Sequence, residues 1–208
     1  MDRLETDADI ERGIKFLCRQ EPAFTRAAAR INAPIRLRRR AGGFDALLKA
    51  IVAQQLSVAS AAAIWARAQA AGLTQEKRLL SATDAALREV GLSRQKIKYV
   101  RALAVADVDF DALSAASTEE VVEVLTQISG IGVWTAEIYA LFSLGHQDVF
   151  PSGDLALQEA AKDLFAMNQR PSANALKTMA IDWSPWRAVA AHVLWAYYSA
   201  IKKREGIG

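Results

Sequence analysis

The sequence is poor in residues that bind metals or cross-link a chain. Among 208 residues it has one cysteine, Cys18, and two histidines, His146 and His192. One thiol cannot form a disulfide within the chain, a cysteine-rich zinc site or a four-cysteine iron–sulfur cluster. Two histidines also argue against a histidine-based metal site. The sequence therefore predicts that no cluster or transition metal serves as a cofactor.

Long hydrophobic runs and leader-like segments are absent as well. No apolar run approaches the about 20 residues that a membrane-spanning helix needs. The first residues, Met1–Glu11, are acidic and polar rather than signal-like. These features predict a soluble, cytoplasmic protein of a reducing compartment, with no membrane partner. The net charge of +3 and the pI near 9.1 favour a polyanionic partner only weakly, because many unrelated proteins share such values.

Strand-like alternation, regular repeats and Gly/Ser-rich linkers are also missing, whereas alanine is abundant and helix caps recur. The apolar residues from Phe44 to Val52 follow a spacing of three and four, which makes one buried helix face. The predicted fold class is all-α. Helices are expected over residues 7–20, from 22 onward, and over 44–55, 57–71, 83–90, 93–107, 121–127, 132–144, 154–165, 172–181 and 185–203.

The segment from Leu125 to Ala136 has the most informative local pattern. A short predicted helix ends, Gly130 and Gly132 flank Ile131, and a second helix begins at once. Glycines permit positive φ and close approach of another backbone. Amides at the start of a helix can then form a nest for a phosphate. The pattern favours a helix–hairpin–helix that contacts a nucleic-acid backbone without reading its sequence. The alternative is a tight turn whose glycines serve geometry alone.

Asp154 precedes a second informative helix. It stands directly before an apolar-periodic segment, in the N-cap position. Considered alone, it is a capping aspartate. The helix dipole also favours the ionised form of an N-cap carboxylate, and a reaction that develops positive charge requires such an anion.

Five motifs together indicate a family. They are Ala50–Ser57, Gly91-Leu92-Ser93 with Lys96 and Tyr99, the 125–136 hairpin, Asp148–Leu157, and Trp183–Arg187. In this order and over about residues 43–196, the chain resembles the helix–hairpin–helix DNA glycosylases, specifically the 3-methyladenine DNA glycosylase II (alkylbase) branch. The first 42 residues are too few and too helical for the extra N-terminal β-domain of some members, so the resemblance is to the compact form.

The resemblance implies two helical lobes with an active-site cleft between them. Residues 43–145 would form a six-helix lobe that carries the hairpin. Residues 1–42 and 146–208 would form the second lobe, which carries Asp154 as the catalytic carboxylate. The implied partner is double-stranded DNA with a damaged base, bound by a monomer at the bacterial-type nucleoid.

The implied reaction is hydrolysis of the bond between an alkylated purine, such as 3-methyladenine or 7-methylguanine, and its sugar. Asp154 would stabilise the oxocarbenium-like sugar and orient or deprotonate water. In bifunctional relatives such as endonuclease III, a lysine after the hairpin attacks the sugar, and here Trp134 takes that position. The sequence therefore predicts a monofunctional enzyme that leaves an intact abasic site and has no lyase activity.

Cationic alkylpurines suit electron-rich aromatic faces. Trp134 and Trp195 match positions that line the family's base pocket. Tyr139 and Phe44 are further candidates, with ordinary core packing as the alternative. Two other tryptophans, Trp183 and Trp186, are predicted to anchor the C-terminal helices.

The family inserts a side chain into the base stack to offset the cost of flipping a nucleotide. The loop Gln54-Gln55-Leu56-Ser57 takes that place, with Gln55 at the wedge position and Leu56 beside it. Which of them enters the stack stays open. The alternative makes Leu56 a core residue and Gln55 a surface cap. The expected DNA-backbone contacts are Gly130, Ile131, Gly132 and Thr135. The resemblance also implies a monovalent cation, Na⁺ or K⁺, on the carbonyls of Thr126, Ile128 and Ile131.

Two other functions stay open at this point. The same fold could excise deaminated or oxidised bases, or the chain could be a non-catalytic helix–hairpin–helix DNA-binding module.

Overall fold

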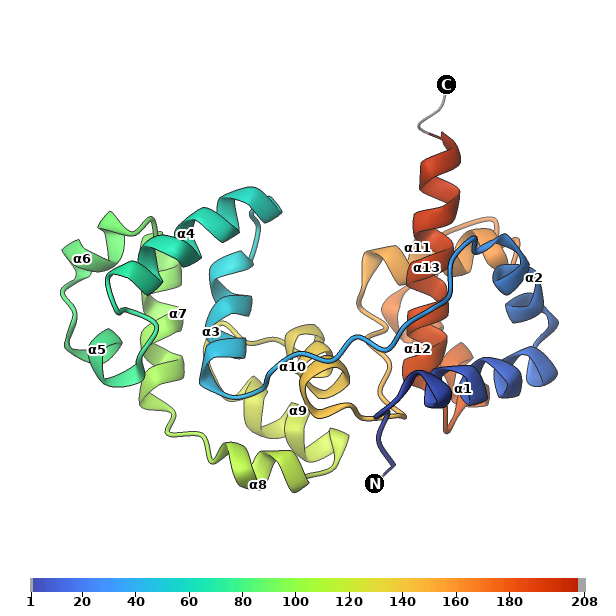
Figure 1. Cartoon of the computed structure of the whole chain (residues 1–208), viewed down its shortest axis with the longest axis horizontal. Helices are drawn as coiled ribbons and strands as arrows, with labels where there is room; N and C mark the ends of the chain where they lie inside the picture. The colour runs from blue at the N-terminus through green and yellow to red at the C-terminus, as the bar shows by residue number, and fades with distance from the viewer. Residues whose placement is uncertain (1, 206–208) are drawn as a thin grey trace. The chain divides into compact units, whose positions relative to one another are not determined.

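The computed structural model describes residues 2–205, and the elements in this range are helical (Figure 1). The all-α class predicted from the sequence is therefore confirmed. An isolated bridge between Arg3 and His146 is the one β-type pairing in the described range. No described helix has the length and apolar character needed to cross a membrane. The helices are α1 (Asp7–Gln20), α2 (Pro22–Arg30), α3 (Phe44–Ala53), α4 (Val58–Ala70), α5 (Glu76–Ser81), α6 (Asp84–Glu89), α7 (Arg94–Val105), α8 (Phe110–Ala115), α9 (Thr118–Thr126), α10 (Val133–Tyr139), the π-helical turn η1 (Ala140–Leu144), α11 (Leu155–Leu164), α12 (Ala173–Met179), the 3₁₀ turn η2 (Ala180–Trp183) and α13 (Arg187–Glu205).

The chain divides into two compact units. Residues 40–139 form one unit, called here the continuous unit, and residues 1–39 with 140–208 form the other, the discontinuous unit. The boundaries expected from the resemblance were 42/43 and 145/146. Residues 140–145 belong with the discontinuous unit because Phe142 stacks on Trp195 and the Gly145 carbonyl accepts a hydrogen bond from the Leu4 amide at 2.8 Å.

The continuous unit contains eight helices, α3 to α10, where the sequence predicted six. The two additional helices are α5 and α8, each six residues long. Six residues are too few to show a helical hydrophobic period, and no glycine closely follows either helix, unlike the equally short α6, which Gly91 terminates. The last predicted helix of this segment is also shorter than expected, because α10 ends at Tyr139 and the chain continues as η1.

The continuous unit is built around α3 and α7. These two helices pack against each other, α3 also contacts α4, and α9 packs on α10. Leu47, Ile51 and Val100 are fully buried in this core. Side chains of Ser57, Thr83, Ser93 and Ser117 cap four of the helices by accepting a backbone N–H bond. The caps satisfy amides that short helices would otherwise leave unpaired.

The discontinuous unit is built around α13, which contacts α1, α2 and α11 (Figure 1). The run from Ala188 to Leu194 is buried on every side of the helix. A helix that is apolar all round is an interior helix. Its small residues allow the neighbouring helices to approach closely. This packing fixes the positions of the side chains from Ala188 to Leu194.

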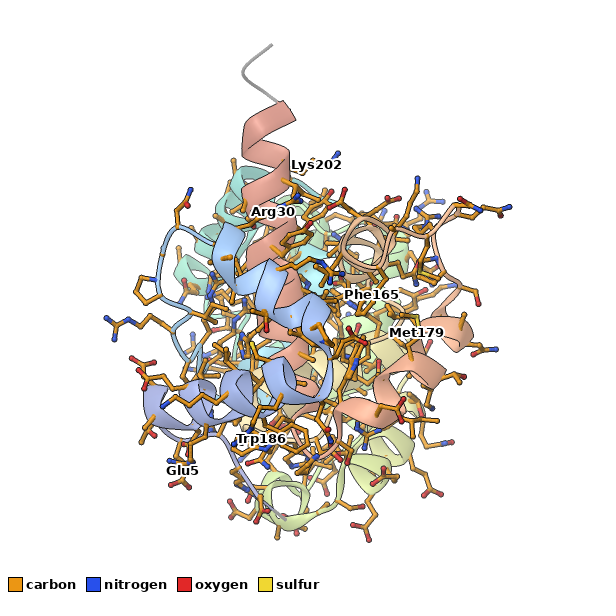
Figure 2. All side chains as sticks on the ribbon, turned by 90° about the vertical axis from the view of Figure 1, so that its right-hand side faces the viewer. Glu5, Arg30, Phe165, Met179, Trp186 and Lys202 are labelled. Atoms are coloured by element: carbon orange, nitrogen blue, oxygen red, sulfur yellow. The ribbon has the colours of Figure 1, made fainter. Side chains whose placement is uncertain are left out.

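An aromatic cluster around Trp183 forms another part of the core of the discontinuous unit. Trp183 lies edge-on to Phe24 and Phe150, with ring centroids 5.2 and 5.3 Å apart, and stacks on Phe165 at 5.9 Å. Phe165 lies near Met179 on the face shown in Figure 2. Trp183 thus anchors η2 to α2, as the sequence predicted for this tryptophan. Trp186 packs against Gly13 of α1, where a Cβ would lie 2.7 Å from the indole.

Candidate active site

Asp154 is the N-cap of α11, as the sequence predicted. Its Oδ1 accepts hydrogen bonds from the amides of Ala156 at 2.9 Å and Leu157 at 3.1 Å. The same oxygen accepts a third bond from the indole Nε1 of Trp195 at 3.2 Å. Trp195 comes from α13, 41 residues further along the chain. Three donors from two helices therefore fix the orientation of this carboxylate.

The loop that carries Asp154 is held by its own network. The Asp148 carboxylate accepts two bonds from the Arg187 guanidinium, each 2.8 Å long, and one from the Ser184 hydroxyl at 2.7 Å. Burial raises the pKa of Asp148, but the bonds from Arg187 and Ser184 outweigh it, so the pKa lies below its ordinary value. The Gln158 amide also donates to the Ser152 carbonyl at 2.9 Å. The loop is thereby tied to both α11 and α13.

Trp195 belongs to a second aromatic group. Its ring stacks on Phe142 with centroids 5.6 Å apart and meets His192 edge-on at 6.1 Å. His192 is 4% exposed, and its Nε2 has no hydrogen-bond partner among the described residues. Burial, assisted by the positive charge of Arg38, lowers the pKa of His192 to about 4. This imidazole is therefore neutral at physiological pH.

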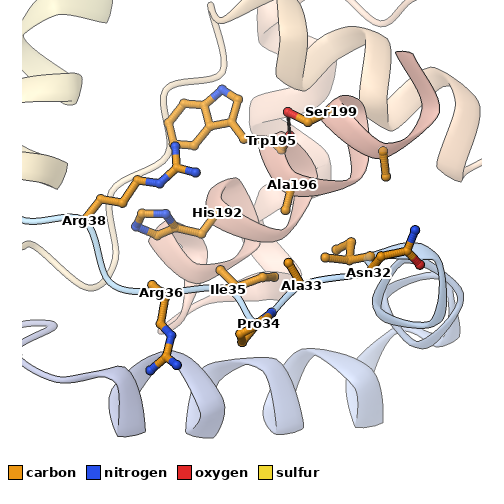
Figure 3. A pocket seen from close by; sticks show the side chains of 12 residues that line it. Asn32, Ala33, Pro34, Ile35, Arg36, Arg38, His192, Trp195, Ala196 and Ser199 are labelled. Carbon is orange, nitrogen blue, oxygen red and sulfur yellow. Dashed lines mark hydrogen bonds between the residues drawn. The ribbon is translucent and has the colours of Figure 1, made fainter. Parts of the chain in front are cut away.

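A cavity of about 710 Å³ opens beside this group (Figure 3). Residues 31–38, which follow α2, line one side of it, and α13 lines the other with His192, Trp195 and Ser199. The volume lies within the about 300–1,000 Å³ typical of small-molecule pockets. Trp195 lines this cavity and also donates a hydrogen bond to Asp154. The cavity and the candidate catalytic carboxylate are therefore connected through this one tryptophan within the discontinuous unit.

The hairpin of the continuous unit has two glycines in different environments. Gly130 has φ +97° and lies against Tyr99, so a Cβ there would be 2.3 Å from the Tyr99 ring. Gly132 has no atom within 4 Å of a built Cβ and is exposed. Ile128 and Ile131 are buried and join the turn to the core. Gly130 thus permits packing, whereas Gly132 leaves the start of α10 open to solvent.

The loop between α3 and α4 is connected to this hairpin. The Gln54 side-chain amide donates to the Gly130 carbonyl at 2.8 Å. The Lys96 ammonium donates to the Val52 carbonyl at 2.6 Å at the end of α3, and burial lowers the pKa of Lys96. Gln55 between these anchors adopts φ +56°. Gln54 was grouped with the wedge residues in the sequence, but its side chain connects two loops.

Gln55 and Leu56 lie on the surface of the same loop. Gln55 is exposed, and Leu56 is 40% exposed. The alternative that made Leu56 a core residue is therefore not what the structure shows. The partners of Gln54 and Lys96 lie 76 and 44 residues away, so no local sequence pattern predicted these two hydrogen bonds.

The predicted pocket residues are distributed over both units. Trp195 lies with Asp154 in the discontinuous unit, whereas Trp134, Tyr139 and Phe44 lie in the continuous unit. Trp134, at the start of α10, is 45% exposed. Tyr139 is buried and its hydroxyl accepts a bond from the Gly43 amide at 2.8 Å, and burial raises its pKa. Tyr139 thus has a structural role, and its place in a base pocket stays a prediction, as does that of Phe44.

Comparison with known proteins gives this geometry a context. The family model described as "HhH-GPD superfamily base excision DNA repair protein" matches residues 48–187. The chain belongs to the HhH-GPD superfamily. The matched range contains the α3–α4 loop, the hairpin and Asp154, and it ends at Arg187, the partner of Asp148.

Two of the proteins to which this chain is similar in sequence come from fission yeast. The chain is 27% identical to "Alkylbase DNA glycosidase-like protein mag2" of Schizosaccharomyces pombe over 162 residues, 73% of this chain and 76% of that protein. It is 29% identical to "DNA-3-methyladenine glycosylase 1" of the same organism, over 73% of this chain and 71% of the relative. The alkylbase branch predicted from the motifs is thereby supported by name in both cases.

Solved structures of the superfamily agree with the fold. A DNA-3-methyladenine glycosidase from Bacillus halodurans superposes with a TM-score of 0.81 at 33% identity, covering 92% of this chain and 91% of that chain. The Schizosaccharomyces pombe 3-methyladenine DNA glycosylase Mag1, solved in complex with abasic DNA, gives a TM-score of 0.75 at 26% identity, covering 88% and 95%. The similarity extends over nearly the whole length of each chain.

Proposed function

We propose that this chain is a monofunctional DNA glycosylase of base excision repair that hydrolyses alkylated purines from DNA and leaves an abasic site. The observation that supports it most is the carboxylate of Asp154, fixed by three donors beside a ligand-sized cavity. Membership of a base-excision-repair superfamily and the names of the relatives support the substrate class.

The proposed chemistry is a dissociative displacement at the sugar carbon. The bond between the sugar and the purine nitrogen breaks, and the electron pair leaves with the base. A cationic alkylpurine departs as a neutral molecule, while positive charge develops on the sugar. Asp154 stabilises that charge in the transition state, which raises the rate rather than the affinity alone. A water molecule then adds to the sugar and gives up its proton, with Asp154 as the base.

The remaining residues have assigned parts in the proposal. The main chain at Gly130, Ile131, Gly132 and Thr135 contacts a DNA phosphate, and Gln55 or Leu56 fills the space that the flipped nucleotide leaves. Trp195 and Trp134 contact the base, with Tyr139 and Phe44 as further candidates. A cation over an indole gains about 0.5–2 kcal/mol. The expected protein is a monomer that acts on double-stranded chromosomal DNA inside the cell, at the nucleoid.

A monovalent cation at the hairpin fits the oxygen atoms present. α9 ends at Thr126; the Val124 and Leu125 carbonyls accept bonds from Gln127 and Ile128, whereas no described amide donates to the Thr126 carbonyl. The Ile128 carbonyl accepts one bond, from the Ile131 amide at 3.0 Å, and a carbonyl oxygen has a second lone pair. The carbonyls of Thr126, Ile128 and Ile131 would bind Na⁺ or K⁺, and the ion would supply positive charge for the phosphate.

The direct test is chromatography of bases released from methylated DNA by the wild type and by Asp154→Asn. We expect the variant to lose at least about 100-fold in rate, the scale of a lost transition-state contact. Asparagine is also a good N-cap, so the fold should persist. Equal release rates for the two proteins would refute the mechanism.

A matched control is Asp109→Asn. Asp109 caps α8 by accepting from the amides of Asp111 and Ala112, in the same way that Asp154 caps α11. Its substitution should leave base release unchanged. Loss of activity in both variants would mean that the effect comes from helix capping and not from the position of Asp154.

The absence of strand cleavage can be tested separately. Trp134 has no amine to form a Schiff base with the sugar. We therefore expect no covalent protein–DNA adduct after borohydride treatment of a reaction that releases base. A trapped adduct would show that another amine acts as nucleophile and would change the reaction class to glycosylase/lyase.

A further inference from the structure

The cavity beside Trp195 has an unusual arginine. Three arginines of residues 36–39 differ in their partners. Arg36 forms an ion pair with Asp7 at 2.7 Å, and Arg39 donates to the Leu4 and Ser143 carbonyls, each at 2.9 Å. Arg38 has no hydrogen bond or ion pair with any described residue, and its guanidinium lies beside Trp195 and His192 (Figure 3). Its five N–H donors are therefore available to a ligand.

His192 is the second group at this place that lacks a partner. Its Nε2 is buried and makes no hydrogen bond, although buried polar atoms are nearly always paired. Because this imidazole is neutral, one of its ring nitrogens can accept a hydrogen bond. The donors of Arg38 and a neutral imidazole thus lie together in a cavity lined by Trp195, which also bonds Asp154.

We propose that Arg38 and His192 recognise the six-position edge of the flipped purine, and that they favour 6-oxopurine lesions over 6-aminopurine lesions. This inference rests on the proposed glycosylase function and names the substrate class within it.

The hydrogen-bonding patterns of the bases give the reason. A 6-oxopurine such as 7-methylguanine or hypoxanthine presents an acceptor, O6, beside a donor, N1–H. The Arg38 guanidinium can donate to O6, and a ring nitrogen of neutral His192 can accept from N1–H. In 3-methyladenine the six-position carries an amino group, which is a donor. Arg38 would then face a second donor with no acceptor between them, and an unpaired buried polar group costs binding energy.

The test compares two lesions in one substrate. Duplex DNA treated with a methylating agent contains both 7-methylguanine and 3-methyladenine, and chromatography measures the single-turnover release of each. For Arg38→Gln we expect the rate ratio of 7-methylguanine to 3-methyladenine release to fall about tenfold relative to wild type. Release from a duplex with one hypoxanthine should fall by a similar factor. His192→Phe, which keeps a ring against Phe142 and Trp195, should change the ratio in the same direction.

Arg36→Gln is the matched control, because it removes one charge from the same segment but its side chain turns to Asp7 on α1 (Figure 3). It should leave the ratio unchanged. A uniform loss for both lesions in Arg38→Gln, with a weaker salt dependence, would mean that Arg38 contacts a DNA phosphate and would overturn the inference. An unchanged ratio would overturn it too. If the wild type releases neither methylpurine, the proposed function itself fails.

Discussion

The two units place their candidate functional groups in opposite ways. In the discontinuous unit, the carboxylate of Asp154 and the rings of Trp195 and His192 are side chains fixed by an interior helix. In the continuous unit, the hairpin presents main chain at Gly132, on short capped helices. The difference suits the two units to different tasks, the reaction in one and backbone binding in the other. Chemistry depends on particular side chains, whereas a backbone phosphate can be bound by peptide groups that most sequences could supply.

We expect substitutions in the two units to affect different measured quantities. Substitutions at the discontinuous unit's site should reduce rate with little effect on DNA affinity. Substitutions at the hairpin should affect stability and affinity through backbone geometry.

The largest effect is expected at Gly130. In Gly130→Ala the added Cβ would overlap the Tyr99 ring, and alanine would have to adopt φ near +97°. Together, left-handed strain and overpacking should lower the free energy of unfolding by about 3 kcal/mol, measured by urea denaturation.

Gly132→Ala provides the matched comparison, because its Cβ has open space. It should keep the stability within about 0.5 kcal/mol of wild type and lower DNA affinity, since the methyl group stands where a phosphate would approach. Full DNA affinity in Gly132→Ala would place the backbone contact elsewhere.

The next effect is the pH dependence of stability that His192 causes in the discontinuous unit. The pKa of His192 falls to about 4 in the folded protein, so the unfolded chain takes up this proton first as the pH decreases from about 6.5. Buried neutral His192 therefore stabilises the fold fully above about pH 6.5, and this stabilisation is lost as the pH falls from there through 4. The loss should approach about 3 kcal/mol. Unfolding free energies of wild type and His192→Phe between pH 7 and 4 measure it, and parallel curves for the two proteins would contradict the prediction.

Trp195→Phe should have a smaller effect. Phenylalanine preserves an aromatic ring against Phe142 but cannot donate to Asp154. Loss of one orienting hydrogen bond to a charged group should slow single-turnover base release about tenfold, with DNA affinity little changed. Trp186→Phe, which alters a tryptophan packed on Gly13, is the control and should retain the wild-type rate. If Trp195→Phe lowered DNA affinity but left the rate of base release unchanged, Trp195 would act in binding and not in orienting Asp154.

The smallest effect is expected at Gln54. Gln54→Ala removes the hydrogen bond to the Gly130 carbonyl and should cost about 1 kcal/mol of stability. Because this bond connects the Gln55 loop to the hairpin, DNA affinity should decrease as well. Gln69→Ala, at an exposed position of α4, should change neither stability nor affinity. Fluorescence anisotropy with an abasic-site duplex measures the affinity. Unchanged affinity would mean that the two loops act independently.

Local features of the site were predictable from the sequence. The cap at Asp154 depends on residues three or fewer apart, and the structure confirms it. The hairpin glycines were visible for the same reason. Helix existence was also predictable wherever ten or more residues showed one apolar face, as over Phe44–Ala53.

Long-range partners were not predictable in this way. The Trp195–Asp154 bond, the Gln54–Gly130 bond and the buried neutral state of His192 arise only when distant segments pack together. Several arginines stand close together in residues 36–40, but their partners cannot be read from the sequence: Arg39 bonds two carbonyls of its own unit. Charge alone does not indicate whether an arginine faces water, a carboxylate or a peptide group.

The discontinuity of the catalytic unit also bears on the order of protein synthesis. Residues 40–139 leave the ribosome as one stretch, so the hairpin can be complete while the other unit still lacks α13. The indole that orients Asp154 is made 41 residues after it. If the proposed function holds, a chain that stopped before α13 would keep the hairpin but lose the indole that orients Asp154, and we expect it to retain DNA contacts without releasing bases.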